Sequence, residues 1–150
     1  MSVIEIVREA VSTPEPRLVR AARVAARIQH GAGYRWVGIY ERENNDIVAL
    51  AWTESREPAH RRFPATDGLC GAALRSGETV VVGDVRNDPR YLTTFGDTRS
   101  EIIVPVKSRS GSVLGLIDVE SDRPNAFTEQ DRVLLENCAR EMAPLWEQPA

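Results

Sequence analysis

The sequence predicts an α+β domain in which a central antiparallel sheet carries the N- and C-terminal helices on one face and loops on the other. Apolar residues recur at helical spacing at both ends of the chain. Between these ends, short runs alternate apolar and polar residues and are separated by turn residues. This alternation argues against a doubly wound parallel sheet, whose strands are buried on both faces. We assign one domain over residues 1–150, with helices at 1–30, the sheet at 34–121 and a helix at 128–146.

Two helices are expected before the sheet. The first is indicated by apolar residues at helical spacing, namely Ile4, Val7 and Val11. Pro14 and Pro16 interrupt this pattern. The second helix extends to about residue 29, and its apolar stripe is predicted to be Leu18, Ala22, Ala25 and Ile28. The alanines would allow a sheet or a partner helix to approach closely, and Gly33 ends the helix.

The first half of the sheet is expected to be a hairpin of residues 35–40 and 47–52, joined by an Asn-rich turn. Side chains alternate across a strand, so the two faces can be assigned. One face receives Trp36, Gly38 and Tyr40, and the other receives Val37 and Ile39. The polar segment 53–66 is predicted to be a loop with a short strand near Phe63.

The second half of the sheet follows a short helix. In order, we expect a helix at 69–76, a strand at 79–82, a loop at 84–99, and strands at 101–106 and 113–119. A loop as long as 87–99 inside a compact domain is usually functional or mobile. Thr128 and Asp131 fit the N-cap of the C-terminal helix, and Pro144 should end or kink it.

Composition excludes several classes of function. A net charge of −3 gives no general attraction to nucleic acid or to acidic membranes, so neither is expected as a partner. The apolar runs fall far short of the roughly 20 residues that span a bilayer. The N-terminus lacks the pattern of a signal peptide. Two cysteines, Cys70 and Cys138, indicate no disulfide framework, so a cytoplasmic location is expected.

Three acids stand out because each lies in an otherwise apolar strand: Glu101, Asp118 and Glu120. Asp118 and Glu120 share a face. A carboxylate on a half-buried strand is unfavourable unless it is paired or reaches water. These acids could therefore lie at a solvent-facing edge or pair with Arg86, Arg90 or Arg99. Alternatively, they form an anionic pocket that binds a cationic group.

Cys70 and the aromatic residues each have a structural and a functional interpretation. Trp36 and Tyr40 could be core aromatics or pocket walls. Cys70 falls in the first turn of the short helix, with Thr66 or Asp67 as a possible cap, and this position lowers the pKa of a thiol. It could equally be a small buried side chain. No His or Cys pair has metal-ligand spacing, so no metal site is predicted.

A family resemblance rests on landmarks spread over residues 68–121. They are Gly68, Gly71, Gly77, Glu78, Asp84, Val85, the Asp-Pro-Arg-Tyr run at 88–91, the Thr-Arg-Ser-Glu run at 98–101, Val104, Pro105, Gly115 and the Asp-Val-Glu-Ser run at 118–121. In this order they resemble a GAF domain, a PAS-like sensor fold. The resemblance implies that residues 36–40 line a ligand pocket under the loops.

One GAF branch, which reduces free methionine-R-sulfoxide, is similar at residues 36–40, 68–71, 100–102 and 118–121. The likeness implies a pocket of Trp36, Tyr40, Cys70, Glu101, Asp118 and Glu120, although the last acid is usually Asp. In that branch the essential thiol precedes the Ser-Glu motif, where Thr94 stands here. The resolving thiol aligns with His60. Sulfoxide reduction requires a thiolate and a second thiol, and only Cys70 remains.

We therefore expect a small-molecule-binding GAF sensor without catalysis or a cofactor, for a cationic or amino-acid-like ligand. Patterns for cyclic nucleotides, bilins and haem are incomplete. One alternative is a divergent free methionine-R-sulfoxide reductase using Cys70, and another is a structural dimerisation module. A homodimer through the terminal helices is expected from the second-helix stripe together with Leu134, Cys138, Met142 and Leu145.

Overall fold

The computed structural model describes residues 1–53 and 56–147. A six-stranded sheet has the order β3-β2-β1-β6-β5-β4, and its neighbouring strands pair antiparallel. The strands are β1 (Trp36–Glu43), β2 (Asp46–Trp52), β3 (Arg62–Pro64), β4 (Val80–Val82), β5 (Ser100–Lys107) and β6 (Val113–Ser121). The helices are α1 (Val3–Val11), α2 (Arg17–Ala32), α3 (Gly68–Ser76) and α4 (Glu129–Arg140), with 3-10 turns η1 (Val85–Asn87) and η2 (Ala143–Trp146). The predicted α+β class is confirmed.

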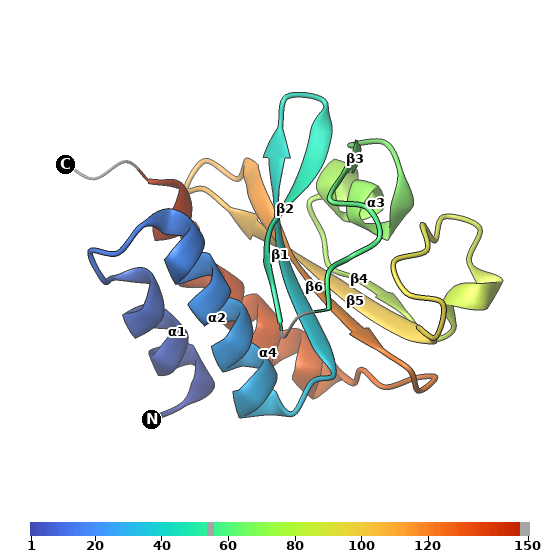
Figure 1. Ribbon diagram of the computed structural model, residues 1–150, viewed down its shortest axis with the longest axis horizontal. Coiled ribbons are helices and arrows are strands. Elements are labelled where there is room, and N and C mark those ends of the chain that lie inside the picture. Colours follow the sequence, from blue (N-terminus) through green and yellow to red (C-terminus); the bar gives the residue numbers. More distant parts are fainter. Residues whose placement is uncertain (54–55, 148–150) are drawn as a thin grey trace.

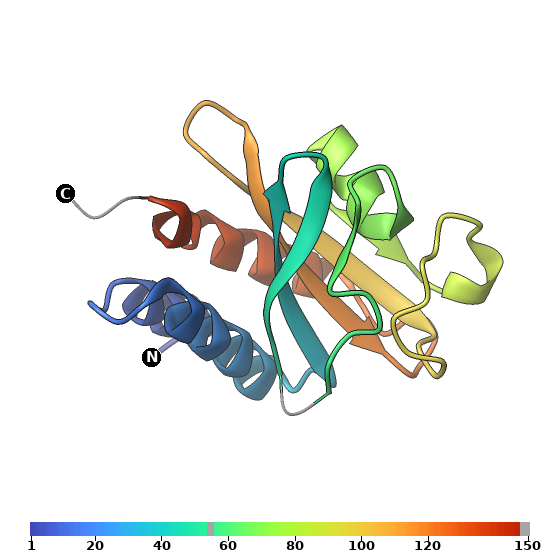
Figure 2. The same ribbon diagram turned by 45° about the horizontal axis from the view of Figure 1, so that its top comes forward.

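The two faces of the sheet are covered by different parts of the chain. Helices α1, α2 and α4 lie together on one face, which we call the helix face (Figure 1). Helix α3 and the loop of residues 87–99 lie on the other, the loop face (Figure 2). The strand alternation predicted for β1 is confirmed, because Val37 and Ile39 join the helix-face core while Trp36 and Tyr40 join the loop-face cluster.

Helix ends follow local sequence signals. Thr128 caps α4 in a capping box: its hydroxyl accepts from the Asp131 N–H, and the Asp131 carboxylate accepts from the Thr128 N–H at 2.7 Å. Gly33 ends α2 at a φ of +72°, a conformation that favours glycine. Helix α4 ends at Arg140, and Pro144 then lies within the 3-10 turn η2. The predicted N-cap of the C-terminal helix is thus confirmed.

The predicted apolar stripe of α2 is partly wrong. Ala25 and Ile28 are buried, but Leu18 is 56% exposed and Ala22 is also exposed. The buried residues are Ala21, Val24, Ala25 and Ile28. Both stripes fit a helical period, and contacts of α2 with α1 and with strands β1 and β2 select between them. In contrast, Cys138, Met142 and Leu145 are fully buried in the helix-face core.

Candidate functional site

Strand pairing brings the three acids to one place on the loop face. Glu101 on β5 lies opposite Glu120 on β6, and Asp118 lies two residues earlier on β6. On the other side of β6, Asp118 is opposite Gly38 and Glu120 is opposite Trp36. The exposed fractions of Glu101, Asp118 and Glu120 are 4%, 2% and 2%. The three carboxyl groups are therefore buried side by side.

The absence of a side chain at Gly38 makes room for the aromatic residues beside these acids. A Cβ at Gly38 would lie 2.4 Å from the Trp36 ring and 3.0 Å from the Tyr40 ring. The two rings thus lean over the glycine between them. Tyr40 also contacts Phe63 edge-on, with ring centroids 6.1 Å apart. The result is an aromatic wall next to the carboxyl cluster.

The carboxyl cluster has few hydrogen-bond partners. One carboxylate oxygen from each acid lies within 4.8 Å of the other two. Thr98 and Tyr91 donate hydrogen bonds to Glu120 Oε1 at 2.8 and 3.4 Å. Asp118 Oδ1 and Glu120 Oε2 are buried and have no hydrogen-bond partner outside the cluster among the described residues. Such buried polar atoms are uncommon and call for an explanation.

The arginines considered from the sequence do not neutralise these acids. Arg86 and Arg99 pair with Asp84, and Arg90 pairs with Asp88. Both partners of each pair lie within the segment 84–99. The interpretation of the three acids as ion-paired with these arginines, or as a solvent-facing edge, is therefore wrong.

Burial and mutual repulsion hold protons on the cluster. Burial, together with the charges of its neighbours, raises the pKa of Glu101 and of Glu120 well above the ordinary value. Burial also raises the pKa of Asp118, to about 6, although hydrogen bonds with Glu101 and Glu120 lower it in part. Desolvation disfavours the charged form of each group. The cluster is thus poised to release protons when a cation arrives.

A small cavity of about 20 Å³ opens beside the cluster. The predicted site residues on its wall are Tyr40, Cys70, Glu101 and Asp118, and residues from elsewhere include His60, Phe63, Leu92 and Thr94. This volume holds about one water molecule. Trp36 and Glu120 line a neighbouring cleft instead, with Arg56, Phe95 and Asp97. The structure therefore distributes the six predicted residues over a cavity and the cleft next to it.

Cys70 differs from the prediction made for its thiol. It lies in the first turn of α3, but its exposed fraction is only 6%. Burial, and then the charges of Asp118 and Glu101, raise its pKa well above the ordinary value, so the predicted lowering is wrong. Asp67 occupies the N-cap position without a side-chain capping bond. Cys138 lies in the helix-face core, on the opposite side of the sheet.

Sequence reasoning missed several residues that complete the site. Tyr91 and Thr98, which donate to Glu120, belong to the loop 87–99 and had no periodic pattern to mark them. Leu92 had none either. His60 and Thr94, which align with thiol positions of the reductase branch, both lie on the cavity wall. For His60 and Thr94, the alignment with the reductase branch was the sequence feature that could have identified them as site residues.

The donor set restricts what the site could hold. Three carboxylates with oxygens within 4.8 Å of one another could contact a single cation. Magnesium prefers octahedral coordination and calcium takes six to eight oxygens. With one oxygen from each acid and a cavity that holds about one water, the site would offer four ligands, fewer than either ion takes. An ammonium group, which donates up to three hydrogen bonds, matches three carboxyl groups more closely.

Comparison with known proteins agrees with this fold. A family model described as a GAF domain matches residues 13–147. GAF domain-containing protein A of Dictyostelium discoideum is 29% identical over 119 residues, which are 79% of this chain and 74% of that protein. The structure of a type II free methionine-R-sulfoxide reductase from Thermoplasma acidophilum has a TM-score of 0.79 and 30% identity. The match covers 96% of this chain and 94% of the reductase chain.

A second reductase structure was obtained with substrate bound. The free methionine-R-sulfoxide reductase from Neisseria meningitidis, in complex with its substrate, superposes with a TM-score of 0.86 and 29% identity. The match covers 96% of this chain and 86% of that chain. The family match extends over most of the chain and the six-stranded sheet agrees with it, so the chain belongs to the GAF domain family.

Proposed function

We propose that this GAF domain binds a small molecule with an ammonium group beside an apolar body, and that it acts as a sensor without catalysis of its own. The observation that carries the proposal is the buried cluster of Glu101, Asp118 and Glu120, in which two carboxylate oxygens have no partner from outside the cluster among the described residues. A cation would satisfy those oxygens and relieve the repulsion among the acids. A free amino acid or a small amine is the preferred class of ligand.

The surroundings of the cluster support an organic cation. Tyr40 and Phe63 are buried on the cavity wall, and Leu69 and Leu92 lie with them. Aromatic faces attract cations, and the aliphatic side chains would contact an apolar body. Sensing would follow a population shift: a ligand that binds better to one arrangement of the loop and terminal helices would favour that arrangement.

The test is a thermal-shift screen of amino acids, simple amines and divalent cations at neutral pH. We expect amines or amino acids to raise the melting temperature and divalent cations to have less effect. For the compounds that bind, Glu101→Gln or Asp118→Asn should weaken affinity by roughly 10- to 150-fold, because a hydrogen bond to a charged group contributes about 1.5–3 kcal/mol. Glu9→Gln, an exposed substitution on α1, is the matched control.

Two results of this screen would contradict the proposal. One is that no cationic organic compound shifts the melting temperature. The other is that the compounds that bind are indifferent to both pocket substitutions. A large shift with a divalent cation, lost in Asp118→Asn, would replace the amine with a metal ion as the ligand.

A divergent free methionine-R-sulfoxide reductase is the second candidate. It is supported by the 30% identity to the Thermoplasma reductase and by Cys70 on the cavity wall. The chemistry needs a thiolate and a second thiol. Here the pKa of the Cys70 thiol is raised by burial, and Cys138 lies across the sheet. We expect no turnover with dithiothreitol or thioredoxin. Turnover that Cys70→Ser abolishes would establish the enzyme.

A homodimer through the terminal helices is a further proposal, and dimerisation alone is the third candidate function. Leu18 and Val19 on α2 are 56% and 43% exposed, and adjacent exposed apolar residues favour a contact surface. The C-terminal residues named in the sequence analysis add little to this surface, because Cys138, Met142 and Leu145 are buried in the core. Light scattering at tens of micromolar should give twice the monomer mass, and a monomer mass would contradict the proposal.

A further inference from the structure

The loop of residues 87–99 covers the carboxyl cluster. Leu92 and Thr94 form part of the cavity wall, while Tyr91 and Thr98 donate hydrogen bonds to Glu120. The cavity beneath has a volume of about 20 Å³. An amino acid or amine needs several times the volume of one water molecule. A ligand of the proposed class can therefore enter only if the cavity widens, and this loop forms part of the cavity wall.

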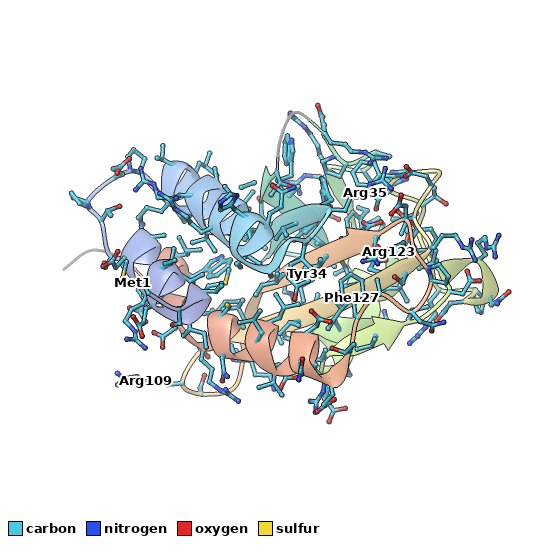
Figure 3. The ribbon with its side chains drawn as sticks, turned by 90° about the horizontal axis from the view of Figure 1, so that it is seen from below. Met1, Tyr34, Arg35, Arg109, Arg123 and Phe127 are labelled. Carbon is cyan, nitrogen blue, oxygen red and sulfur yellow. The ribbon has the colours of Figure 1, made fainter. Side chains whose placement is uncertain are left out.

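Asp97 connects the loop to two other segments of the chain. Its Oδ2 is 2.5 Å from Arg35 Nη2, and its Oδ1 is 2.8 Å from Arg56 Nη2. Arg35 directly precedes β1, where it lies at the end of the sheet (Figure 3), and it also pairs with Asp122 at 2.8 Å. Arg56 belongs to the segment between β2 and β3. One loop carboxylate thus joins two arginines that are far apart in the sequence.

The contacts around Arg56 continue into the pocket. Its guanidinium carbon lies 4.2 Å from the centroid of the Phe95 ring. Phe95 in turn contacts Trp36 edge-on, with centroids 5.1 Å apart. The Trp36 indole N–H donates to the Arg56 carbonyl at 2.8 Å. Movement of the loop away from Arg56 would therefore disturb the aromatic wall beside Glu120.

Among the described residues, the other ion pairs of segment 84–99 join side chains of that segment to one another. Arg90 pairs with Asp88, and Arg86 and Arg99 both pair with Asp84. They stabilise local turns. Asp88 consequently provides a matched control for Asp97, because both are ion-paired aspartates of one loop and they differ in what their partners anchor.

We propose that the pairs of Asp97 with Arg35 and Arg56 form a reversible latch that holds the loop 87–99 closed over the carboxyl cluster. The identity of what enters rests on the proposed function, but the opening itself does not. Exposed fractions of 34% for Arg35, 37% for Arg56 and 48% for Asp97 make each pair weak, as reversible opening requires. Burial raises the pKa of Asp97 in part, yet hydrogen bonds from both arginines lower it overall, so Asp97 stays charged at neutral pH.

Cys70 reports directly on this opening. Its thiol is buried beneath the loop, whereas Cys138 is buried in the helix-face core and serves as an internal control. The experiment measures the rate at which N-ethylmaleimide modifies each cysteine, by mass spectrometry of the folded protein at one pH. Asp97→Asn should accelerate modification of Cys70 by about 2- to 30-fold, because two exposed ion pairs are lost. Cys138 should be unaffected, and so should Cys70 in Asp88→Asn.

Salt provides a test without mutation. Salt screens exposed ion pairs. Raising sodium chloride from 0.02 to about 1 M should therefore accelerate the reaction of Cys70 with N-ethylmaleimide in the chain without substitutions. The same change should have little effect in Asp97→Asn. Hydrogen exchange of the amides at 91–98 supplies a second readout, and it should be faster in Asp97→Asn than in Asp88→Asn.

Equal Cys70 rates and equal exchange in Asp97→Asn, Asp88→Asn and the unmodified chain would overturn the latch. Parallel acceleration of both cysteines would also overturn it, since that result reports global unfolding. The latch and the proposed ligand fail separately. If amines do not bind while the Asp97 effect persists, the latch stands and the ligand class is wrong. If amines bind while Asp97→Asn has no effect, the ligand class stands and the latch is wrong.

Discussion

The two faces of the sheet bury side chains of different chemical character. On the helix face, the residues of β1, β5 and β6 in the hydrophobic core are aliphatic: Val37, Ile39, Ile102, Val104, Val106, Ile117 and Val119. On the loop face the same strands contribute Trp36, Tyr40 and three carboxylic acids. Burial of the first set is favourable in itself. Burial of acids without ion-pair partners is unfavourable, so the loop face lowers stability at the place where we propose the ligand site.

The first and largest prediction concerns the helix face. Leu135 on α4 is fully buried there, so Leu135→Ala should lower the free energy of unfolding by about 2–5 kcal/mol, through lost burial and the cavity that remains. Urea denaturation measures the change. Val133 on the same helix is 48% exposed, and Val133→Ala should change the value by less than about 0.5 kcal/mol. Equal losses would mean that this face is not a packed core.

The second prediction uses pH to separate the two faces. The pKa of Asp118 is raised from 3.8 to about 6 in the folded chain, so the folded state holds protons that the unfolded state releases. Stability should therefore fall as pH rises from about 4 through 6, by an amount on the order of 3 kcal/mol from this group. Glu101 and Glu120, whose pKa values are also raised, extend the fall to higher pH.

Asp118→Asn is the variant that tests this assignment, because it removes the titrating group from the cluster. Its free energy of unfolding, measured in urea at intervals between pH 4 and 8, should depend less on pH than that of the unmodified chain. Asp84 should change stability with pH in the opposite direction. Its hydrogen bond with Arg86 lowers its pKa from 3.8 to about 2, so its contribution to stability is lost as pH falls from about 4 to 2. Stability that rises through pH 6 would contradict the prediction.

Sequence patterns predicted the elements and the faces of the strands, because alternation assigns side chains to faces whatever lies above them. Thr128 and Asp131 likewise identify a helix start from local chemistry alone. The stripe of α2 was misassigned because alanines occur on two adjacent faces, and only packing against other elements selects one. Cys70 was misjudged for a similar reason: its helix position suggested exposure to the helix dipole, but α3 packs this residue against the acids.

The sequence left two interpretations of the three acids open, ion-paired or gathered in an anionic pocket, and it did not select between them. The arginines that could have paired with the acids form local pairs instead. Which acid each arginine pairs with depends on the conformation of the loop, and no periodic sequence pattern predicts that conformation. Here local rules and the folded structure disagree, and such disagreement is expected at functional sites.

The third prediction concerns Gly38, which separates Trp36 from Tyr40 on the loop face. A methyl group there would lie 2.4 Å from the Trp36 ring, so Gly38→Ala should displace the aromatic wall and lower stability by about 1–3 kcal/mol. Gly96→Ala is the control, because a Cβ at that position meets nothing within 4 Å. Thermal denaturation compares the two. Equal stability in both variants would show that the wall has room to move.

The last and smallest prediction compares one hydrogen bond on each side of the sheet. Thr98 donates to Glu120 at 2.8 Å beneath the loop, and Thr79 donates to Glu136 of α4 at 2.6 Å. Each Thr→Val substitution removes one hydroxyl and should lower the free energy of unfolding by about 1 kcal/mol. The two losses should differ in their pH dependence, because the two carboxylates differ in burial: Glu120 is 2% exposed, whereas the Glu136 side chain is 28% exposed and also pairs with Arg132.

The sign of that difference follows from the pKa of Glu120. Burial and the charge of Asp118 raise it, and the Thr98 hydrogen bond lowers it by stabilising the carboxylate. Thr98→Val therefore raises this pKa further, and the stability lost should grow as pH rises from 5 to 8. For Thr79→Val the loss should stay nearly constant over the same range, since Glu136 retains Arg132 as a partner and is partly exposed. Urea denaturation at both pH values measures each loss, and a constant loss for Thr98→Val would mean that this hydroxyl does not stabilise a charged Glu120.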